Sequence, residues 1–249
     1  MFHRGRIGAA AGCTAAVFAL AILVGVRAGA QGAARVGGSD SLVIVHANVI
    51  DGVTDAPMLN ASVVVENGHI QYVGQGGVTT GFTGSAPPTV IDLKGAWLLP
   101  GFVDAHTHIA DMAAARRALM SGATTVGEAG VDHFADVGLR ELNHAGVVDV
   151  PDAIAAGYHV RPHPADAFFL DFPQLADLLP GVHGTEAVRR MVRAMATKGV
   201  NRIKVMATER ACLPDTDPRI RIFSDEELAA VVDEASKNGL WVVAHAHGD

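Results

Sequence analysis

The sequence has little cysteine. Only Cys13 and Cys212 occur among the 249 residues, and Cys13 lies in the first thirty residues, whose composition differs from the rest. If the first thirty residues are removed, Cys212 is the single cysteine left. One cysteine cannot form an internal disulfide or build a cysteine-based metal site. A metal ion in this protein would therefore be bound by histidine, carboxylate or a less usual ligand.

Aromatic and charged residues are also scarce, at 5% and 18%, whereas hydrophobic residues make up 49% of the chain. The formal net charge is −7, and lysine and arginine form no cluster of the kind that follows a phosphate backbone. Repeats, low-complexity tracts and basic amphipathic segments are absent from the sequence as well. The charge pattern argues against nucleic acid as a partner. The hydrophobic content is that of a globular protein, and the length of 249 residues predicts one or two domains.

The first thirty residues have the composition of an export signal. Arg4 and Arg6 form a basic start, and residues 7–26 are apolar. Residues 28–30, Ala-Gly-Ala, then provide a small-x-small cleavage site. A single membrane anchor is the alternative, because about 20 apolar residues can span a bilayer. The richness in alanine and glycine favours cleavage after residue 30, export to the periplasm or the medium, and no stable membrane association afterwards.

Residues 41–97 have the β-rich runs and turn dipeptides of a small β unit, which follows a Gly/Ala/Ser linker at 31–40. The strongest local signal is Asn67-Gly68, which joins two β-rich runs and predicts a hairpin. Another strand is predicted over 89–92. We therefore expect a small antiparallel β unit in this part of the chain.

After Trp97 the pattern alternates between strands and helices. The predicted helices cover 111–121, 136–144, 186–198 and 225–238. Residues 147–184 yield no firm element. We interpret His159 and His163 there as solvated loop residues, with a role in a substrate loop as the alternative. The alternation implies parallel strands with helical crossovers, in a doubly wound sheet or a (β/α)₈ barrel. In both folds, chemistry gathers at the carboxyl ends of the strands.

The most informative segment is 98–108, Leu-Leu-Pro-Gly-Phe-Val-Asp-Ala-His-Thr-His, in which an apolar run leads to His106 and His108. On a strand, residues i and i+2 point to the same face, so both imidazoles can reach one metal ion just past the strand end. With 12 histidines in the chain, about half of one such pair is expected by chance. Two solvated loop histidines are therefore the alternative.

Two further predicted strands carry matching groups. Lys204 lies in the apolar strand 200–206, where its charge is costly to bury unless it is paired or modified. An exposed edge lysine, or one that snorkels past its neighbours, is the alternative. Carbamylation by CO₂ would instead make Lys204 an anion able to bridge two metal ions. His245 and His247 repeat the i, i+2 spacing at the end of the strand 240–244.

These segments resemble the amidohydrolase superfamily. The resemblance runs from about Leu42 to the end of the chain, and its later motifs look like the branch of Xaa-Pro dipeptidases and imidazolonepropionase-related hydrolases. It rests on segments 63–70, 92–95, 98–108, 203–208, 223–227 and 243–248, in that order. The resemblance implies a TIM-like (β/α)₈ barrel from residue 98, preceded by part of a composite β-sandwich domain.

The resemblance also implies a metal centre with two zinc ions in the complete site. His106 and His108 would bind the more buried ion, carbamylated Lys204 would bridge both ions, and His245 would bind the second. His247 would contact the substrate, a small-molecule amide or dipeptide. A metal-activated hydroxide would then attack the carbonyl of the scissile carbon–nitrogen bond.

The sequence departs from this pattern in several places. The resemblance places a proton-transferring aspartate after the eighth strand and another histidine ligand after the sixth, and neither is in these residues. From Leu98 to Asp249 there are 152 residues, against about 250 for a full barrel. We therefore expect a barrel truncated after about strand five and assign no catalytic residue. Gly127-Glu128 and 209–211 stand where this branch usually has Arg-Asp and glycines, which could alter substrate fit.

Three hypotheses follow from the sequence. The chain is the amino-terminal part of an exported binuclear zinc hydrolase, or a mononuclear deaminase-type member in which Lys204 is only structural, or an inactive or regulatory fragment. A metal count near one per chain would favour the second hypothesis. The sequence leaves open whether the protein forms a homo-oligomer.

Overall fold

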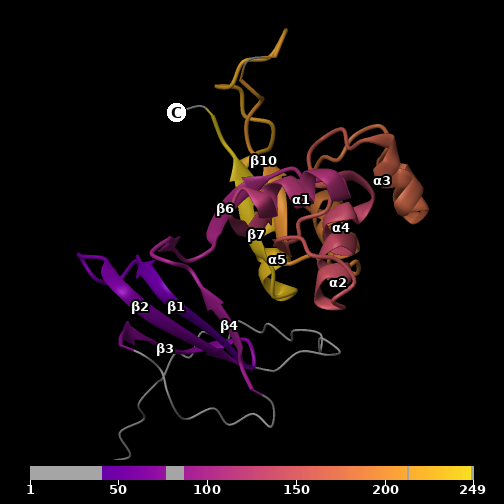
Figure 1. Cartoon of the computed structure of the whole chain (residues 1–249). Coiled ribbons are helices and arrows are strands. Elements are labelled where there is room, and N and C mark those ends of the chain that lie inside the picture. The colour runs from indigo at the N-terminus through magenta and orange to yellow at the C-terminus, as the bar shows by residue number, and fades with distance from the viewer. Residues whose placement is uncertain (1–40, 77–86, 212, 248–249) are drawn as a thin grey trace, which may run out of the picture. The chain divides into compact units, whose positions relative to one another are not determined.

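The computed structural model describes residues 41–76, 87–211 and 213–247. The predicted export signal, the linker and Cys212 lie outside these residues. Among the described residues, no helix combines the length and the apolar character that a membrane crossing requires. The strands form an amino-terminal sheet and, later in the chain, parallel strands that alternate with helices (Figure 1).

The amino-terminal sheet has the strand order β3-β2-β1-β4, and β5 also pairs with β1. The predicted hairpin at Asn67-Gly68 joins β2 to β3, and both turn residues have the positive φ angles, 52° and 76°, that a tight hairpin turn requires. The strands are β1 (Ser41–Val49), β2 (Met58–Glu66), β3 (His69–Gln75), β4 (Thr89–Asp92) and β5 (Trp97–Leu98).

The prediction of a wholly antiparallel unit is wrong for two of these strands. β1, β2 and β3 pair antiparallel, but β4 and β5 run parallel to β1. A parallel neighbour requires the chain to cross over, and the 13 residues between Gln75 and Thr89 exceed the dozen or so that such a crossover needs. Strand propensity carries no information about the direction of pairing, which depends on this connection.

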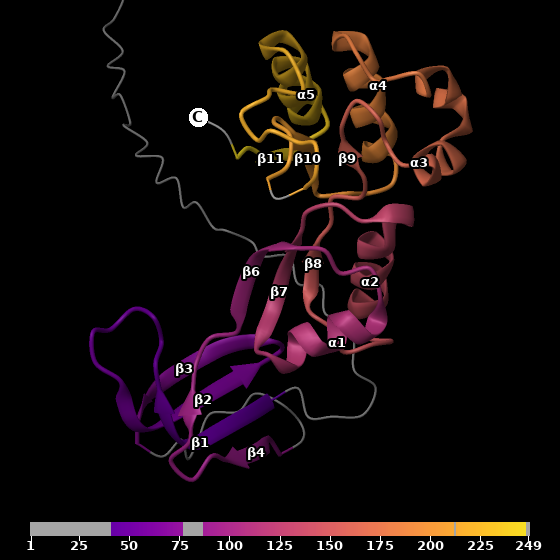
Figure 2. The ribbon, with the colours of Figure 1, turned by 90° about the horizontal axis from the view of Figure 1, so that it is seen from above.

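The second region contains parallel strands in two sets, β6-β7-β8 and β9-β10-β11 (Figure 2). β8 and β9 belong to one extended segment, because the Ala155 carbonyl between them accepts hydrogen bonds from the amides of Asn201 and Arg202. This segment is the third strand of the alternation, in the region without a firm prediction. The strands are β6 (Phe102–Thr107), β7 (Ala123–Glu128), β8 (Asp152–Ile154), β9 (His159–Val160), β10 (Arg202–Met206) and β11 (Trp241–His245).

The four predicted helices are confirmed, with small differences at their ends. The structure adds a short helix, α3, and two 3₁₀ turns, 132–134 and 173–178, in parts that yielded no helix prediction. The α-helices are α1 (Met112–Met120), α2 (Ala135–His144), α3 (Asp166–Asp171), α4 (Thr185–Ala196) and α5 (Asp225–Lys237).

The largest core cluster packs α4 and α5 against one face of β10. Met191 and Met195, at helical spacing on α4, are fully buried in the same cluster as Ile203 and Val205 of β10. Burial of each such side chain contributes about 1.5–3 kcal/mol. Because side chains alternate along a strand, Arg202 and Lys204 point to the opposite face of β10, away from the helices.

Candidate metal centre

The two histidines of the first parallel strand lie close to each other near the end of β6. His106 is in β6 and His108 follows its end, with ring centroids 5.4 Å apart. Both residues are exposed, since no other described strand pairs with the free edge of β6. The His108 ring makes a 2.9 Å hydrogen bond through Nδ1 to the Gly130 carbonyl. That bond fixes the ring and leaves Nε2 for a ligand.

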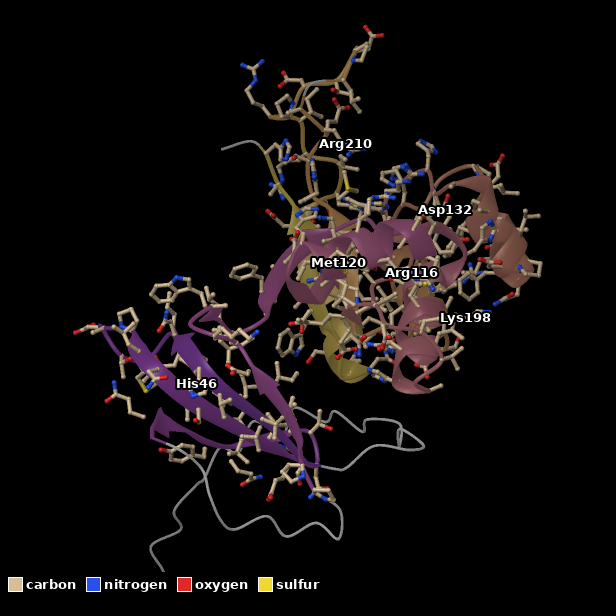
Figure 3. The ribbon with its side chains drawn as sticks, viewed as in Figure 1. His46, Arg116, Met120, Asp132, Lys198 and Arg210 are labelled. Atoms are coloured by element: carbon tan, nitrogen blue, oxygen red, sulfur yellow. The ribbon has the colours of Figure 1, made fainter. Side chains whose placement is uncertain are left out.

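Lys204 is buried, with 3% of its surface exposed, in the middle of β10. Within the described residues, its ammonium group makes no hydrogen bond or ion pair. Burial lowers the pKa of Lys204, and the charges of Arg202 and Arg210 lower it further. Arg210 lies on the loop that follows β10 (Figure 3). The alternative of an exposed edge lysine is therefore excluded.

His245 ends β11 with an unpartnered nitrogen. Its Nε2 atom is buried, and no described residue forms a hydrogen bond with it. Such a group costs about 1–3 kcal/mol when it stays unsatisfied, so the atom is suited to a ligand. The His247 ring lies 4.1 Å from the His245 ring between centroids. His247 is held by its amide, which donates to Thr208 Oγ1 at 3.0 Å, and by Nδ1, which accepts from the Ala211 amide at 3.3 Å.

The electrostatics favour neutral histidines in this region. Desolvation and the neighbouring Lys204 and His108 lower the pKa of His106. Burial and the charges of His247 and Lys204 likewise lower the pKa of His245. Metal ions bind the neutral imidazole. These two rings therefore need to release few protons when they bind an ion near pH 7.

Sequence analysis missed His159. We interpreted it as a solvated loop residue, but it lies in β9, half buried, with its Cα opposite that of Lys204. Its ring stacks on His108 at 6.0 Å between centroids. A β-carbon on Gly130 would lie 2.3 Å from the His159 ring, so glycine leaves the space for that ring. The requirement for a third parallel strand between the helices at 136–144 and 186–198 was the signal that could have revealed His159.

The remaining residues of interest lie elsewhere or play other parts. His163 is exposed and faces His183, with ring centroids 6.2 Å apart. Asp104 is exposed and accepts a hydrogen bond from the His106 amide at 3.1 Å. In the part of the chain that the structure describes, no three His, Cys, Asp or Glu side chains meet at one point where they could hold a metal ion. The predicted ligand set depends on an anion at Lys204, which the unmodified amine does not supply.

Residues 97–249 match the amidohydrolase family along most of the parallel region. The chain belongs to the amidohydrolase family. The family prediction is thereby confirmed, and members of this family generally bind divalent metal ions, often zinc. The Nε2 atom of His245, which has no hydrogen-bond partner among the described residues, and the oriented His108 ring fit such ions.

Similar proteins agree with the predicted fold. The chain is 43% identical over 65 residues to an ochratoxinase from Aspergillus niger, a match that covers 26% of this chain and 14% of that protein. It resembles the structure of an Xaa-Pro dipeptidase with bound methionine in the active site, with a TM-score of 0.67, 24% identity, and coverage of 84% of this chain and 57% of that one.

A prolidase complexed with N-methylphosphonate-L-proline is similar at a TM-score of 0.64 and 25% identity, with coverage of 83% and 56%. The chain thus spans little more than half the length of these two structures and 14% of the ochratoxinase. The likeness confirms an α/β fold of the amidohydrolase type.

Proposed function

We propose that this protein is a metal-dependent hydrolase of carbon–nitrogen bonds in amides or dipeptides. Its site would hold two zinc ions through His106, His108 and His245, with carbamylated Lys204 between them. The observation that carries the proposal is the environment of Lys204. The Lys204 amine is buried and has no partner among the described residues, and it lies on the strand next to β11. The final histidine of β11 has a buried nitrogen that no described residue bonds.

Carbamylation follows from the chemistry of a buried amine. The neutral nitrogen of Lys204 attacks the carbon of CO₂ and a nitrogen–carbon bond forms. One carbon–oxygen π bond of CO₂ opens and leaves its electron pair on oxygen, and the nitrogen releases one proton to solvent. The product is a carbamate with the two oxygens of an anionic ligand. Burial favours the neutral amine by lowering the pKa of Lys204. Arg202 and Arg210, the cations that disfavour the ammonium form, would stabilise the carbamate.

The residues of the chain would prepare the site for substrate. Zinc bound there would supply a hydroxide at neutral pH and polarise the substrate carbonyl. The Gly130 carbonyl holds the His108 ring in one orientation. His159, whose pKa is lowered to about 4, stays neutral beside it and can offer one N–H group to a substrate oxygen. His247 remains our predicted substrate contact.

Dipeptides are the first substrates to test, because the similar structures include an Xaa-Pro dipeptidase and a prolidase. The predicted export signal would place this activity outside the cytoplasm. A site with one metal ion per chain would instead favour the deaminase-type hypothesis, in which Lys204 is only structural.

The experiment compares the wild-type protein with Lys204→Ala and Lys198→Ala. Lys198 is a suitable control because it lies among the helices, away from the Arg210 loop (Figure 3), with its ammonium over the Phe134 and Phe172 rings. Three quantities are measured for each protein. They are the metal content, the hydrolysis of Xaa-Pro dipeptides, and the ¹³C NMR signal of a carbamate after addition of ¹³C-bicarbonate.

In protein that includes the later barrel strands, we expect the wild type and Lys198→Ala to show the carbamate signal, about two metal ions per chain and hydrolysis that chelators abolish. Lys204→Ala should lose the carbamate signal and the chelator-sensitive hydrolysis. Hydrolysis that is indifferent to chelators would refute the proposal.

A further inference from the structure

The ladder between β6 and β7 is irregular at the first histidine. Asp104 pairs with Val126 and Thr107 pairs with Glu128, so two residues of β6, Ala105 and His106, lie opposite one residue of β7. An extra residue of this kind bends a strand and re-aims its side chains. The direction of the His106 ring therefore depends on what holds this irregular turn of backbone.

Arg202 holds that turn from the inner face of β10. Arg202 as a whole is 7% exposed, and its guanidinium donates to the Glu128 carbonyl through Nε at 2.9 Å and Nη2 at 2.6 Å. Nη2 also donates to the Ala105 carbonyl at 3.3 Å, directly before His106. Among the described residues, no carboxylate forms an ion pair with Arg202. The planar fork of arginine thus joins the ends of β6 and β7 through backbone carbonyls.

Gly127 supplies the space for this guanidinium. A β-carbon at Gly127 would lie 2.8 Å and 2.9 Å from the two terminal nitrogens of Arg202, and 2.6 Å from the Ala105 carbonyl oxygen. The backbone of Gly127 is not in the positive-φ region. Glycine is therefore required here by the close approach of the Ala105 carbonyl and of Arg202, and not by backbone conformation.

Glu128 holds the chain on both sides of the second histidine. Its side chain is 1% exposed. One carboxylate oxygen accepts from Thr107 Oγ1 at 2.6 Å, and the other accepts from the Ile109 amide at 2.8 Å. The residues before and after His108 are thereby attached to β7. The two bonds of Glu128 and the bond from His108 to the Gly130 carbonyl together fix the direction of the His108 ring.

We propose that Arg202 and Glu128 are positioning residues for the metal-binding histidines. Arg202 maintains the irregular turn that aims His106, and Glu128 clamps the segment that carries His108. Arg202 lies two residues from Lys204 on the same strand, so it also sets the position of that strand relative to the histidine pair. The inference rests on the proposed metal site and deepens it.

The test compares Arg202→Lys with the same change at Arg189. Lysine keeps the charge at residue 202 but cannot reach two carbonyls with a planar fork. Arg189 lies on α4 and forms ion pairs with Asp233 and Glu234 of α5. These ion pairs join two helices and do not involve the strand ends. A second pair is Glu128→Ala and Glu128→Gln. Glutamine can still accept from the Ile109 amide and donate to Thr107 Oγ1.

The first readout is cobalt substitution, with affinity measured by competition with a chelator and geometry by the visible absorption bands. We expect Arg202→Lys and Glu128→Ala to weaken metal binding about 10- to 100-fold, as changes to residues that orient ligands do, and to alter the absorption bands. Glu128→Gln and Arg189→Lys should stay within a few-fold of wild type. Unchanged affinity and absorption bands in Arg202→Lys and Glu128→Ala would overturn the inference.

The second readout needs no metal. The imidazole ¹H–¹³C signals of His106 and His108, assigned with asparagine variants, should shift or broaden in Arg202→Lys and Glu128→Ala but not in Arg189→Lys. If the wild-type protein takes up no cobalt, the proposed function fails, and this comparison decides the positioning role by itself. Signals that match the wild type in all three variants would refute it.

Discussion

Arg202 and Lys204 lie two residues apart on the same face of β10, yet their surroundings differ. Arg202 donates to backbone carbonyls. Burial lowers the pKa of Arg202, as it does that of Lys204, but the charges of Glu128 and Asp136 oppose this shift at Arg202. Lys204 has no such partner among the described residues, and both charges that act on it are positive. A buried cation is costly without compensation. This contrast at the level of single residues is why we assign a structural bond network to one cation and a chemical modification to the other.

His159 leads to a prediction about pH. Burial first, and then the charges of Arg161 and His108, lower its pKa from 6.5 to about 4. Between these two values the unfolded chain binds more protons than the folded protein at this residue. The free energy of unfolding should therefore fall as the pH is lowered from about 6.5 to 4, and this contribution should be constant above that range.

The measurement is urea unfolding of the metal-free protein and of His159→Gln between pH 4 and 8. Other histidines titrate in the same range, so the quantity of interest is the difference between the two proteins. That difference should change with pH only below about 6.5. Parallel stability curves across the whole range would contradict the assignment of His159 as a buried neutral ring.

At the scale of elements, the local signals located the helices well because caps act within a few residues. Ser224 and Glu227 form the predicted capping box of α5, in which Ser224 Oγ accepts from the Glu227 amide at 3.2 Å and Glu227 accepts from the Ser224 amide at 2.8 Å. The same carboxylate accepts from the Gly184 amide before α4 at 2.6 Å. One cap thus connects two helices of the outer layer.

We predict that Ser224→Ala lowers the free energy of unfolding by about 1 kcal/mol, because the first turn of α5 loses a side-chain acceptor. For a protein of this size, that corresponds to a fall in Tm of about 2–4 °C. Thermal unfolding followed by circular dichroism measures the change. Ser236→Ala, at an exposed position in the last turn of the same helix, should be neutral or slightly stabilising. Equal effects of the two substitutions would argue against the cap.

The sequence did not predict the third parallel strand, because its pieces are too short. Its two hydrogen-bonded pieces, β8 and β9, have only three and two residues, too few to show a period in the sequence. The segment between them includes Gly157, whose φ of 64° interrupts the strand. The backbone carbonyls of this segment accept hydrogen bonds from the Val131 and Asn201 amides, which are distant in the sequence. No local sequence pattern predicts such bonds. Because this strand was not predicted, His159 was not included in the predicted site.

At the scale of the whole molecule, β6 and β11 of the parallel region each have one edge that no other described strand pairs with. Among the described strands, β6 pairs only with β7, and β11 pairs only with β10. Phe102, Val103 and Trp241 on these strands are 58%, 66% and 78% exposed. Exposed apolar strands of this kind promote pairing between chains. Oligomerisation, which the sequence leaves open, can therefore be tested directly.

We predict that the 249-residue polypeptide, prepared alone, self-associates as its concentration rises. The double substitution Val103→Lys and Trp241→Lys should reduce the association, because charged side chains on an edge oppose strand pairing. Light scattering during size-exclusion chromatography measures the mass, and substitution of the exposed Met120 on α1 by lysine is the control. A single monomeric mass at all concentrations would rule out this behaviour.

The sequence by itself determined the family, four of the five α-helices, the hairpin, the positions of His106, His108 and His245 at or near strand ends, and the position of Lys204 within a strand. These features depend on periodicity and motifs within a few residues. Only the tertiary structure decided the parallel direction of β4, the place of His159 beside His108, and the bonds of Arg202 and Glu128. The bond from Arg202 to Ala105 joins residues 97 positions apart. Contacts at such separations arise only when the strands lie side by side, so no local pattern in the sequence encodes them.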